Sequence, residues 1–334
     1  MSEEEVSLVI PARDCAATIG PCLSAVTPLL EASSLAEIIV VDDASTDRTA
    51  GIVADFPVTC VAGRGEGPGA ARNLGWRLAR SPLVWFVDSD CVAEDNALAL
   101  LLSHMKDPMV GAVGGSYGIM TRDSLLARLI HEEIIQRHLR MSHRVDFLAS
   151  FNVLYRRAIL EHLGGFDQRY LKGQDAELSW RVLRAGYQLA FEVNSRVRHY
   201  HPVALWDYLA TQQQQGYWRV WMYMAHRSRA RGDAYSSLID HVQPPVALSA
   251  LASLPLLLFT NARWVPMALI MLLAAAQVPM TLRLVKRKRQ VAYVMYAGLS
   301  FVRVFWRAAG MTAALFSAAC GRSPLKPTNP RSGG

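Results

Sequence analysis

The sequence lacks the features that assign a chain to several common classes. None of its five cysteines forms a CxxC pair, which argues against a zinc site or a disulfide framework and favours a reducing compartment. No GxxxxGK[ST] phosphate loop is present, and although His131–Glu133 begins like a zinc-protease helix, Ile135 stands where the second histidine is needed. The acidic N-terminus, Met1–Glu5, is unlike a signal peptide, so we expect the first part of the chain to stay in the cytosol.

Charged tail blocks are also missing, whereas long apolar runs are abundant in the last third. Hydrophobic residues make up 51% of the 334 residues, and the composition shifts after Pro244-Pro245. We expect three membrane spans there, at about 246–260, 264–284 and 291–320. The alternative for the first two is a pair of buried core helices. The third contains Arg303 and Arg307, so it could instead lie in the membrane interface.

Basic clusters border these apolar runs. Arg227–Arg231 precedes them and Lys286–Arg289 lies between the second and third. The formal net charge of +7, placed in this way, fits an anionic membrane surface and not a nucleic-acid partner. Because Lys and Arg near a span mark its cytoplasmic side, we predict an inner (cytoplasmic) membrane protein with its N-terminal part in the cytoplasm. Residues 206–245 would form amphipathic interface helices or a linker, and 321–334 a flexible tail.

Residues 6–117 alternate short apolar runs with helical spacing, which is typical of a mostly parallel, doubly wound α/β sheet. The predicted strands are Val6–Pro11, Glu37–Val41, Val58–Val61 and Leu83–Val87. The predicted helices are Ala16–Glu31, one opening at Thr46 with Ser45 as its N-cap, and Gly69–Arg80. Beyond them we expect strands at Val110–Tyr117, Phe151–Tyr155 and Tyr187–Val193, and helices at Ser124–Arg140 and Asp175–Ala185.

Two acidic clusters each follow an apolar run. They are Asp42-Asp43, after the run 38–41, and Asp88-Ser89-Asp90, after the run 83–87. Such short runs predict strands buried on both faces of a parallel sheet. In open α/β sheets ligands bind beyond the carboxyl ends of the strands, so the clusters suggest a site for a divalent cation and a phosphate-bearing ligand.

Each cluster also has a structural interpretation. Asp42-Asp43 could close an Asx-turn before Thr46, or it could accept from a base N–H or a ribose hydroxyl. The second cluster could be a solvated turn that caps a helix at Asn96. Its two aspartates could otherwise divide the work, one binding a metal and the other a sugar hydroxyl.

A glycine-rich segment, 63–70, lies between the third strand and the next helix. Gly65–Ala70 fits GxGxxA, which loosely matches a dinucleotide-binding fingerprint. It follows the third strand instead of the first, so a mobile loop near a nucleotide is the alternative. Arg72, early in the helix, is placed to meet a base or a diphosphate.

Three residues nearer the middle of the chain could take part in chemistry. Asp175 starts a helix, where an acid is often only a cap that complements the dipole, but it could also be a general base. His199 and His201 could contact a metal or a diphosphate. Side chains alternate between the faces of a strand, and we take this to mean that at most one of the two reaches the site.

In this order the motifs resemble those of family 2 glycosyltransferases with the GT-A fold, and the tail is similar to that of the bacterial exopolysaccharide (succinoglycan-type) branch. The matching pieces are Val9–Arg13, Val41–Asp47, Gly69–Gly75, Asp88-Ser89-Asp90, Gly164–Asp167 and Gln174–Glu177. The resemblance implies a catalytic domain over residues 1–205. Its nucleotide-sugar-binding half would be 6–117 and its acceptor half 118–205.

The resemblance also implies roles for individual residues. Nucleotide-sugar contacts would come from Pro11, Ala12, Arg13, Asp42, Asp43, Arg72, Asp88 and Ser89. Asp90, with His199, would hold Mn²⁺ or Mg²⁺, and Asp175 would be the catalytic base. The acceptor side would include Gly165, Phe166, Asp167, Gln174, Trp218 and Arg219. Gln174 replaces the usual glutamate, and residues 215–219 only partly match the QxxRW motif of processive synthases, so processivity is not implied.

The function implied is that of an inverting glycosyltransferase. It would move a sugar from a nucleotide-diphosphate donor, expected to be a UDP-sugar, to a membrane-associated acceptor such as a polyprenyl-linked glycan or a lipid phosphate. A dinucleotide-dependent oxidoreductase that uses Gly65–Ala70 is one alternative. The other is a non-catalytic membrane assembly factor with the same fold.

Overall fold

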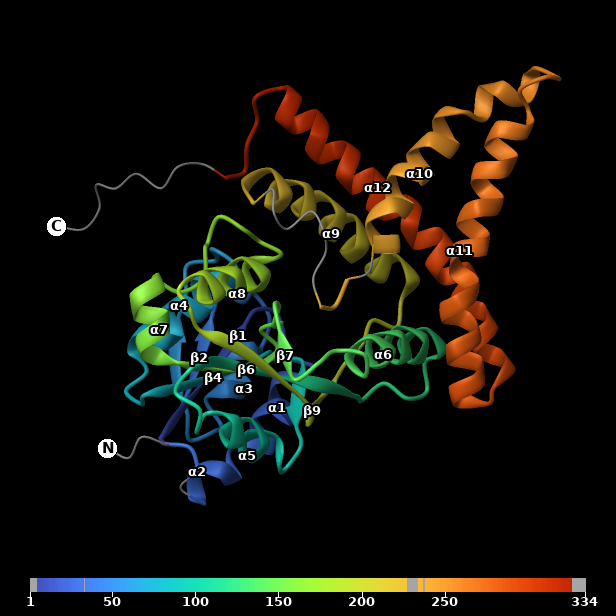
Figure 1. The fold of residues 1–334 in the computed structure, drawn as a ribbon. Coiled ribbons are helices and arrows are strands. Elements are labelled where there is room, and N and C mark those ends of the chain that lie inside the picture. Colours follow the sequence, from blue (N-terminus) through green and yellow to red (C-terminus); the bar gives the residue numbers. More distant parts are fainter. Residues whose placement is uncertain (1–4, 33, 227–233, 237, 326–334) are drawn as a thin grey trace. The chain divides into compact units, whose positions relative to one another are not determined.

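The computed structural model of the chain describes residues 5–32, 34–226, 234–236 and 238–325 (Figure 1). The chain divides into two compact units. The first comprises Met1–Gln168, Gln174–Val203 and Asp233–Tyr235, and the second comprises Arg169–Gly173, Ala204–Gly232 and Ser236–Gly334. The predicted basic cluster Arg227–Arg231 and most of the predicted tail lie outside the described residues.

Within the described residues of the first unit, nine strands form one sheet in the order β3-β2-β1-β4-β8-β6-β9-β5, with β7 paired to β9. The strands are β1 (Val6–Ala12), β2 (Glu37–Asp42), β3 (Thr59–Ala62), β4 (Leu83–Val87), β5 (Cys91–Ala93), β6 (Val110–Ile119), β7 (Arg144–Val145), β8 (Asn152–Arg156) and β9 (Gln188–His199).

The strand directions decide where a site can form. Strands β1 to β4 are parallel, β8 runs against both β4 and β6, and β9 is parallel to β6. It follows that β1, β2, β3, β4, β6 and β9 all point the same way, while β5 and β7 run against β9. The carboxyl ends of six strands therefore meet at one edge of the sheet, as the mostly parallel prediction requires.

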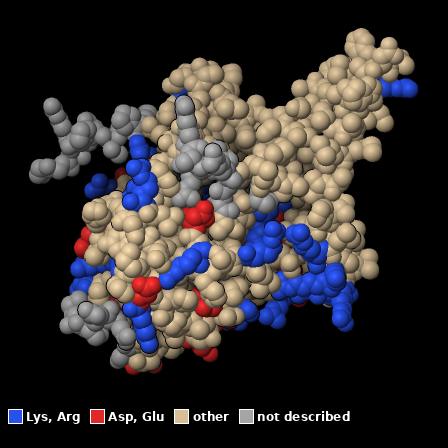
Figure 2. All heavy atoms as spheres, in the orientation of Figure 1, with Lys and Arg blue, Asp and Glu red and all other residues tan. Residues whose placement is uncertain are grey.

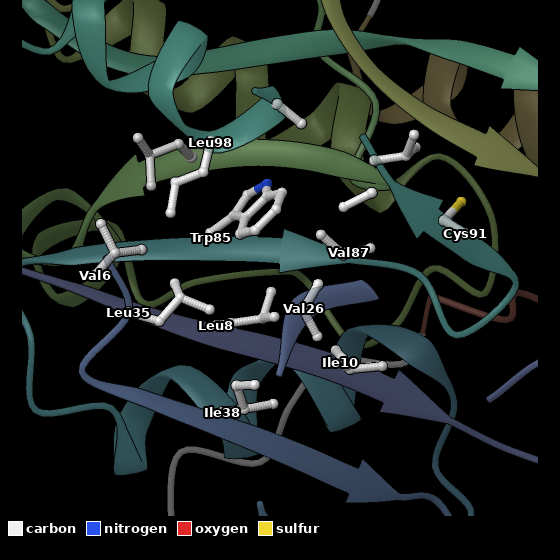
Figure 3. Packing of buried hydrophobic residues seen from close by; sticks show 14 of the residues in the cluster. Val6, Leu8, Ile10, Val26, Leu35, Ile38, Trp85, Val87, Cys91 and Leu98 are labelled. Carbon is white, nitrogen blue, oxygen red and sulfur yellow. The ribbon is translucent and has the colours of Figure 1, made fainter. Parts of the chain in front are cut away.

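Helices cover both faces of the sheet (Figure 1). They are α1 (Ile19–Val26), α2 (Pro28–Glu31), α3 (Thr49–Val53), α4 (Pro68–Leu78), α5 (Ala97–His104), α6 (Leu125–His138), α7 (Arg157–Leu163) and α8 (Gln174–Arg184). Because side chains of β1 alternate, Leu8 and Ile10 pack with α1 and α5 in one core (Figure 3). Val9 packs with α4, α7 and α8 in the other. A Cβ on Gly75 of α4 would lie 2.3 Å from Val9, so glycine permits this close helix–sheet contact.

Several local predictions differ from the structure. The predicted helix 16–31 begins only at Ile19 and is interrupted before Pro28. Ser45 does not cap α3; its hydroxyl accepts from the backbone N–H of Asp14 instead. Strand β9 continues beyond Val193 to His199, and the two- and three-residue strands β7 and β5 were not predicted. Such short strands carry no periodicity that a sequence can reveal.

The second unit is helical in its described residues. Its elements are α9 (Leu205–Ala225), α10 (Leu238–Ala252), the 3₁₀ turns η2 (Leu254–Leu258) and η3 (Val291–Val294), α11 (Trp264–Lys288) and α12 (Met295–Ala319). Helices α9 and α12 approach closely. A Cβ on Gly310 would lie 1.9 Å from the carbonyl oxygen of Gln213, and one on Gly216 would lie 2.2 Å from that of Arg307. Glycine at both positions is therefore required for this packing.

Two helical segments, Trp264–Lys288 and Val291–Ala319, are long and apolar enough to cross a membrane. Large apolar side chains on them are exposed, including Met271 and Phe316 at 69% each. On the face drawn in Figure 2, the upper part of the arm formed by α10 and α11 is almost free of charged side chains, whereas α11 carries Lys286, Arg287 and Lys288 in its last turn. This surface has the composition that lipid contact requires.

The prediction of a membrane span at 246–260 needs correction. Helix α10 starts at Leu238, carries Pro244 and Pro245 inside it and ends at Ala252, and η2 follows. The apolar run therefore divides between two short elements, and neither is long enough to span a bilayer. Pro244 and Pro245, after which the composition shifts, therefore lie within a helix and not between two domains.

Candidate active site

The loops that follow the parallel strands adjoin one another at the carboxyl edge of the sheet. The backbone N–H of Asp43, after β2, donates to the carbonyl of Ala12 in β1 at 2.8 Å. The N–H of Gly63, after β3, donates to the carbonyl of Asp42 at 2.7 Å. Asp88 follows β4 directly, and His199 ends β9. Strand direction thus assembles residues from distant parts of the sequence at one edge.

Asp43 shapes the glycine-rich loop from inside. It is buried, and its carboxylate accepts from the N–H groups of Gly65 at 2.8 Å, Glu66 at 3.2 Å and Gly67 at 2.7 Å. The loop is therefore wrapped around a carboxylate, which differs from the mobile loop considered from the sequence. Gly67 has φ 97°, a conformation that glycine adopts without strain.

Asp42 and the end of β1 line the same edge. Asp42 accepts from the N–H of Ser45 at 3.0 Å, which is the Asx-turn that the sequence allowed. Pro11 and Ala12 are buried, whereas Arg13 is exposed and donates to the carbonyl of Gly65 at 3.3 Å. The surface offered to a ligand at this point is thus mainly Arg13 and the outer side of Asp42.

Arg72 is the central basic group of the site. It is 4% exposed, and its Nη2 donates to Asp88 Oδ1 at 2.5 Å. Its guanidinium lies 5.6 Å from the ring centroid of Phe166. Nε and Nη1 are buried and have no hydrogen-bond partner among the described residues. Buried donors rarely stay unpaired, so these two fit the oxygens of an anionic ligand such as a diphosphate.

The loop 164–167 beside Arg72 is fastened from two helices. Asn73 in α4 accepts from the N–H of Phe166 at 2.8 Å and donates to its carbonyl at 2.7 Å. Arg181 in α8 donates to the carbonyls of Leu163 and Gly165, at 2.6 and 2.7 Å. Neither Asn73 nor Arg181 was singled out from the sequence. The signal for Asn73 was its place directly after Arg72 in a matching motif.

Two residues predicted on the acceptor side are buried. Phe166 packs edge-on against Phe86 with ring centroids 5.3 Å apart, so this contact holds in place the ring on which the guanidinium of Arg72 lies. Gln174 is also buried, and its Oε1 would lie 2.6 Å from a Cβ on Gly69. Asp167, in contrast, is partly exposed. Both side chains are buried, and Gln174 Oε1 has no hydrogen-bond partner among the described residues, so the acceptor-side roles of Phe166 and Gln174 stay predictions.

Asp175 stands at the start of α8 and is partly exposed. Burial raises the pKa of its carboxyl above the usual 3.8; the N–H of Ala176 and the charge of Arg72 work in the other direction, and the charge of Asp88 adds to the increase. Arg72, Asp88 and Asp175 therefore share one electrostatic environment. A carboxylate whose pKa is raised by burial is a better proton acceptor than a solvated one.

Asp90 and His199 form the candidate metal site. His199 Nε2 lies 3.1 Å from Asp90 Oδ2, and Cys91 is the third residue of the cluster. Burial opposes ionisation of Asp90, but the contact with His199 holds the pKa of Asp90 below its ordinary value. Burial raises the pKa of the Cys91 thiol, so it stays protonated and ligates poorly. The remaining oxygen and nitrogen donors suit Mn²⁺ or Mg²⁺.

His201 lies beside His199, and our argument from alternating strand faces is wrong for this pair. The Nδ1 atoms of the two rings are 3.0 Å apart. Residues two apart along an extended chain face the same side, so alternation does not separate His199 from His201. Of these two histidines, His199 contacts Asp90, whereas His201 contacts His199.

The sequence holds one GxSxG pattern, at 114–118, that is not a nucleophile elbow. It lies within β6, and Ser116 is fully buried, with its hydroxyl 2.8 Å from His138 Nδ1. A nucleophile elbow places its serine on an exposed turn between a strand and a helix. Ser116 and His138 are accordingly a structural pair.

The remaining predicted acceptor residues belong to the second unit. Trp218 and Arg219 lie in α9. Trp218 is buried against Tyr170, with ring centroids 6.2 Å apart, and Arg219 Nη2 donates to Ser236 at 3.5 Å. Both residues are held within that helical unit.

The strand order, with acids at the carboxyl ends of β2 and β4 and a histidine at the end of β9, defines a GT-A-like α/β fold. Comparison with known proteins identifies the family: residues 7–164 match Glycosyl transferase family 2, and the chain therefore carries a family 2 glycosyltransferase domain. The match includes the glycine-rich segment 63–70, so the oxidoreductase interpretation of that segment is wrong.

Curated relatives agree with this family. The probable glycosyltransferase YdaM of Bacillus subtilis (strain 168) is 31% identical over 250 residues, which are 69% of this chain and 56% of the relative. The pre-mycofactocin glycosyltransferase of Mycobacterium tuberculosis (strain CDC 1551 / Oshkosh) is 29% identical over 224 residues, 63% of this chain and 45% of the relative. The chain thus spans about half the length of these two relatives.

One solved structure resembles most of the chain. The mannosyltransferase PcManGT from Pyrobaculum calidifontis, determined in complex with GDP-Man and Mn²⁺, superposes with a TM-score of 0.59. The alignment covers 93% of this chain and 87% of that protein at 21% identity. At this identity the likeness concerns the fold.

Proposed function

We propose that the chain is an inverting glycosyltransferase that moves a sugar from a nucleotide-diphosphate donor to a membrane-associated acceptor. The observation that carries the proposal is the group Arg72, Asp88 and Asp175, which lies at the same sheet edge as Asp90 and His199. This edge combines a guanidinium that has two N–H groups available to a ligand, a carboxyl group whose pKa is raised, and two side chains that can bind a metal ion. These are the parts that glycosyl transfer from a nucleoside diphosphate needs.

Each part has a role in the proposed reaction. Nε and Nη1 of Arg72 would donate to diphosphate oxygens, and Asp88 would hold the guanidinium in place. Asp175 would accept the proton of the acceptor hydroxyl while that oxygen attacks the anomeric carbon. Attack opposite the leaving diphosphate inverts the configuration. A divalent ion held by Asp90 and His199 would neutralise charge on the departing nucleoside diphosphate.

The identity of the donor and the cation is part of the proposal. PcManGT was solved with GDP-Man and Mn²⁺, which supports a nucleotide sugar and a divalent cation as ligands of this fold. We propose a UDP-sugar as the donor and Mn²⁺ or Mg²⁺ as the cation. Pro11, Ala12, Arg13, Asp42, Asp43 and Ser89 would surround the nucleoside, with Asp43 acting through the loop that it shapes.

The acceptor side of the proposal depends on the second unit. Two helical segments in it have the length and composition of membrane spans. We propose that they anchor the chain in the inner membrane with the catalytic domain facing the cytoplasm. A polyprenyl-linked glycan or a lipid phosphate would then be the acceptor. The predicted acceptor-side residues are Gly165 and Asp167 in the first unit and Trp218 and Arg219 in the second.

A panel of nucleotide sugars tests the donor. The full chain, purified in detergent, is incubated with each nucleotide sugar, and release of nucleoside diphosphate is measured with Mn²⁺, with Mg²⁺ and with a chelator. We expect one nucleotide sugar to be turned over, and the chelator to stop the release. If no nucleotide sugar is bound or hydrolysed, the assembly-factor alternative replaces our proposal.

Asp90→Ala tests the metal site. We expect this variant to lose metal-dependent nucleotide binding, which calorimetry can measure, because Asp90 is the carboxylate that faces His199. Asp95→Ala is the matched control, since Asp95 is an exposed aspartate on the other side of the short strand β5. Equal nucleotide affinity in the two variants would count against the ligand role of Asp90.

A further inference from the structure

Two further histidines continue from the candidate metal site into the protein. His199 Nε2 faces Asp90 Oδ2 at 3.1 Å, and His199 Nδ1 lies 3.0 Å from Nδ1 of His201. His201 Nε2 lies 3.2 Å from Nδ1 of His131, which belongs to α6. The three imidazoles therefore form an unbroken hydrogen-bonded chain from the end of β9 to α6, in which His201 and His131 are 70 residues apart in the sequence.

The inner members of the chain are buried. His201 is 3% exposed and His131 is 7% exposed. A neutral imidazole carries one N–H and one lone pair, so it must donate at one nitrogen and accept at the other.

With all three imidazoles neutral, two proton arrangements satisfy these hydrogen bonds. In one, Nε2 of His199 carries the proton, His201 donates from Nδ1 to His199, and His131 donates from Nδ1 to His201. In the other, His199 donates from Nδ1 to His201, and His201 donates from Nε2 to His131. A metal ion needs the lone pair on Nε2 of His199, and only the second arrangement leaves that lone pair free.

We propose that His201 and His131 are positioning residues that hold His199 in the tautomer and ring orientation needed to bind the metal ion. This inference rests on the metal site of the proposed function. An imidazole ligand is commonly oriented by the acceptor of its other N–H, which here is a buried histidine instead of a carboxylate. The acceptor is oriented in turn by His131, so the orientation of His199 is set from α6.

The surroundings keep the rings in place. The ring of Tyr117 packs against both His199 and His201, with centroids 4.9 and 5.7 Å apart. The hydroxyl of Thr121 donates to the backbone carbonyl of His201 at 3.4 Å. The imidazoles of His199 and His201 are therefore restrained by packing against a tyrosine ring and by hydrogen bonds to the neighbouring side chains.

The test compares Mn²⁺ affinity among variants of the full chain in detergent. Free Mn²⁺ is counted by electron paramagnetic resonance in the presence of UDP. We expect His201→Leu to weaken Mn²⁺ binding by about 10- to 100-fold, the usual effect of losing the partner of a ligating histidine. His201→Asn should restore most of the affinity, because its Oδ1 can accept where Nδ1 accepts in the wild type. His131→Leu, one bond further away, should have a smaller effect.

His138→Leu is the matched control. His138 lies on the same helix, is similarly buried and also makes one side-chain hydrogen bond, to Ser116, but it is not part of the chain. We expect its Mn²⁺ affinity to equal that of the wild type. Equal affinities of His201→Leu and the wild type would overturn the inference and leave the metal site intact. Absence of Mn²⁺ binding by the wild type would overturn the metal site itself, and the inference with it.

A second measurement does not depend on how the variants fold. In wild-type protein labelled with ¹⁵N-histidine, long-range ¹H–¹⁵N spectra report which ring nitrogen carries the proton. With UDP and diamagnetic Mg²⁺ bound, we expect His199 to be protonated on Nδ1 and His201 on Nε2. The opposite assignment for His201 in that complex would contradict the proposed chain.

Discussion

Two buried arginines, one in each unit, are held in different ways. Arg72 in α4 is 4% exposed and Arg303 in α12 is 5% exposed. Each guanidinium lies 5.6 Å from an aromatic centroid, that of Phe166 and that of Tyr296. Arg303 donates to the hydroxyls of Tyr208 at 3.0 Å, Tyr296 at 2.9 Å and Ser300 at 2.9 Å. Arg72 donates to one side chain, that of Asp88, and its other two nitrogens have no hydrogen-bond partner among the described residues.

The difference separates a structural arginine from a ligand-binding one. Around Arg303, neutral hydroxyls of α9 and α12 accept from both Nη1 and Nη2, so that the protein itself solvates these two groups. Around Arg72, a carboxylate balances the charge while part of the hydrogen-bonding capacity is left unused. Unused buried donors reduce stability unless a ligand completes them. The first unit thus gives up stability at its site.

The largest effect expected in this comparison is that of Asp175→Asn, next to Arg72. Loss of a general base typically lowers kcat by about 10²- to 10⁴-fold. Nucleotide binding should survive, and the free energy of unfolding should not fall, because burial disfavours the ionised carboxylate. Turnover, nucleotide affinity and thermal unfolding measured on one preparation check this. Full turnover in the variant would remove Asp175 as the base.

Arg72→Met should have the next largest effect. We expect the affinity for the nucleoside diphosphate to fall by about 10- to 100-fold, because hydrogen bonds to a charged group contribute about 1.5 to 3 kcal/mol. The melting temperature should change little, since Asp88 is partly exposed and solvent can take over its charge. An unstable variant with normal nucleotide affinity would make Arg72 the equivalent of Arg303.

Arg303→Met is the reverse experiment. Its removal leaves three buried hydroxyls without their donor, which should cost about 1 to 3 kcal/mol of unfolding free energy. Donor hydrolysis per folded molecule should be unchanged. Thermal unfolding in detergent and nucleoside diphosphate release measure the two quantities. A loss of donor hydrolysis without a loss of stability would show that the two arginines do not differ as described.

The smallest effect expected is a change in the pH dependence. Because the pKa of Asp175 is raised above 3.8, activity should fall on the acidic side around a midpoint above that value. The folded state binds this proton more tightly than the unfolded state. Between the unfolded and folded pKa values, the contribution of Asp175 to stability therefore decreases as the pH rises. Unfolding curves of the wild type and Asp175→Asn across this range should converge at low pH.

Local patterns predicted the first half of the fold well. The run Leu83–Val87 forms β4 with the bounds expected, and β2 and β4, which lead into Asp43 and Asp88, are parallel neighbours of β1. Buried parallel strands need continuous apolar runs, so their signal is contained within five or six consecutive residues. The exposed edge strand β3 and the short strands β5 and β7 carry a weaker signal, because their place depends on the strands that they join.

The apolar tail shows where composition misleads. The run 246–260 is apolar enough for a span, but α10 ends at Ala252 and the chain turns through η2. Whether an apolar run forms one helix or two depends on backbone hydrogen bonds that hydropathy does not contain. The roles proposed for Asp42, Asp43 and His201 depend in the same way on partners that are remote in sequence.

By itself, the sequence determined the parallel half-sheet, the presence of acids at the ends of its strands and the family to which the domain belongs, because these follow from short runs of adjacent residues. Only the tertiary structure decided how those acids are engaged. Asp43 is enclosed by its loop, Asp88 is paired with Arg72, and Asp90 meets His199 across 109 positions of sequence. The role of an acidic side chain depends on its contacts. Contacts between residues so far apart in the sequence form only once the sheet has brought the C-terminal ends of its strands together.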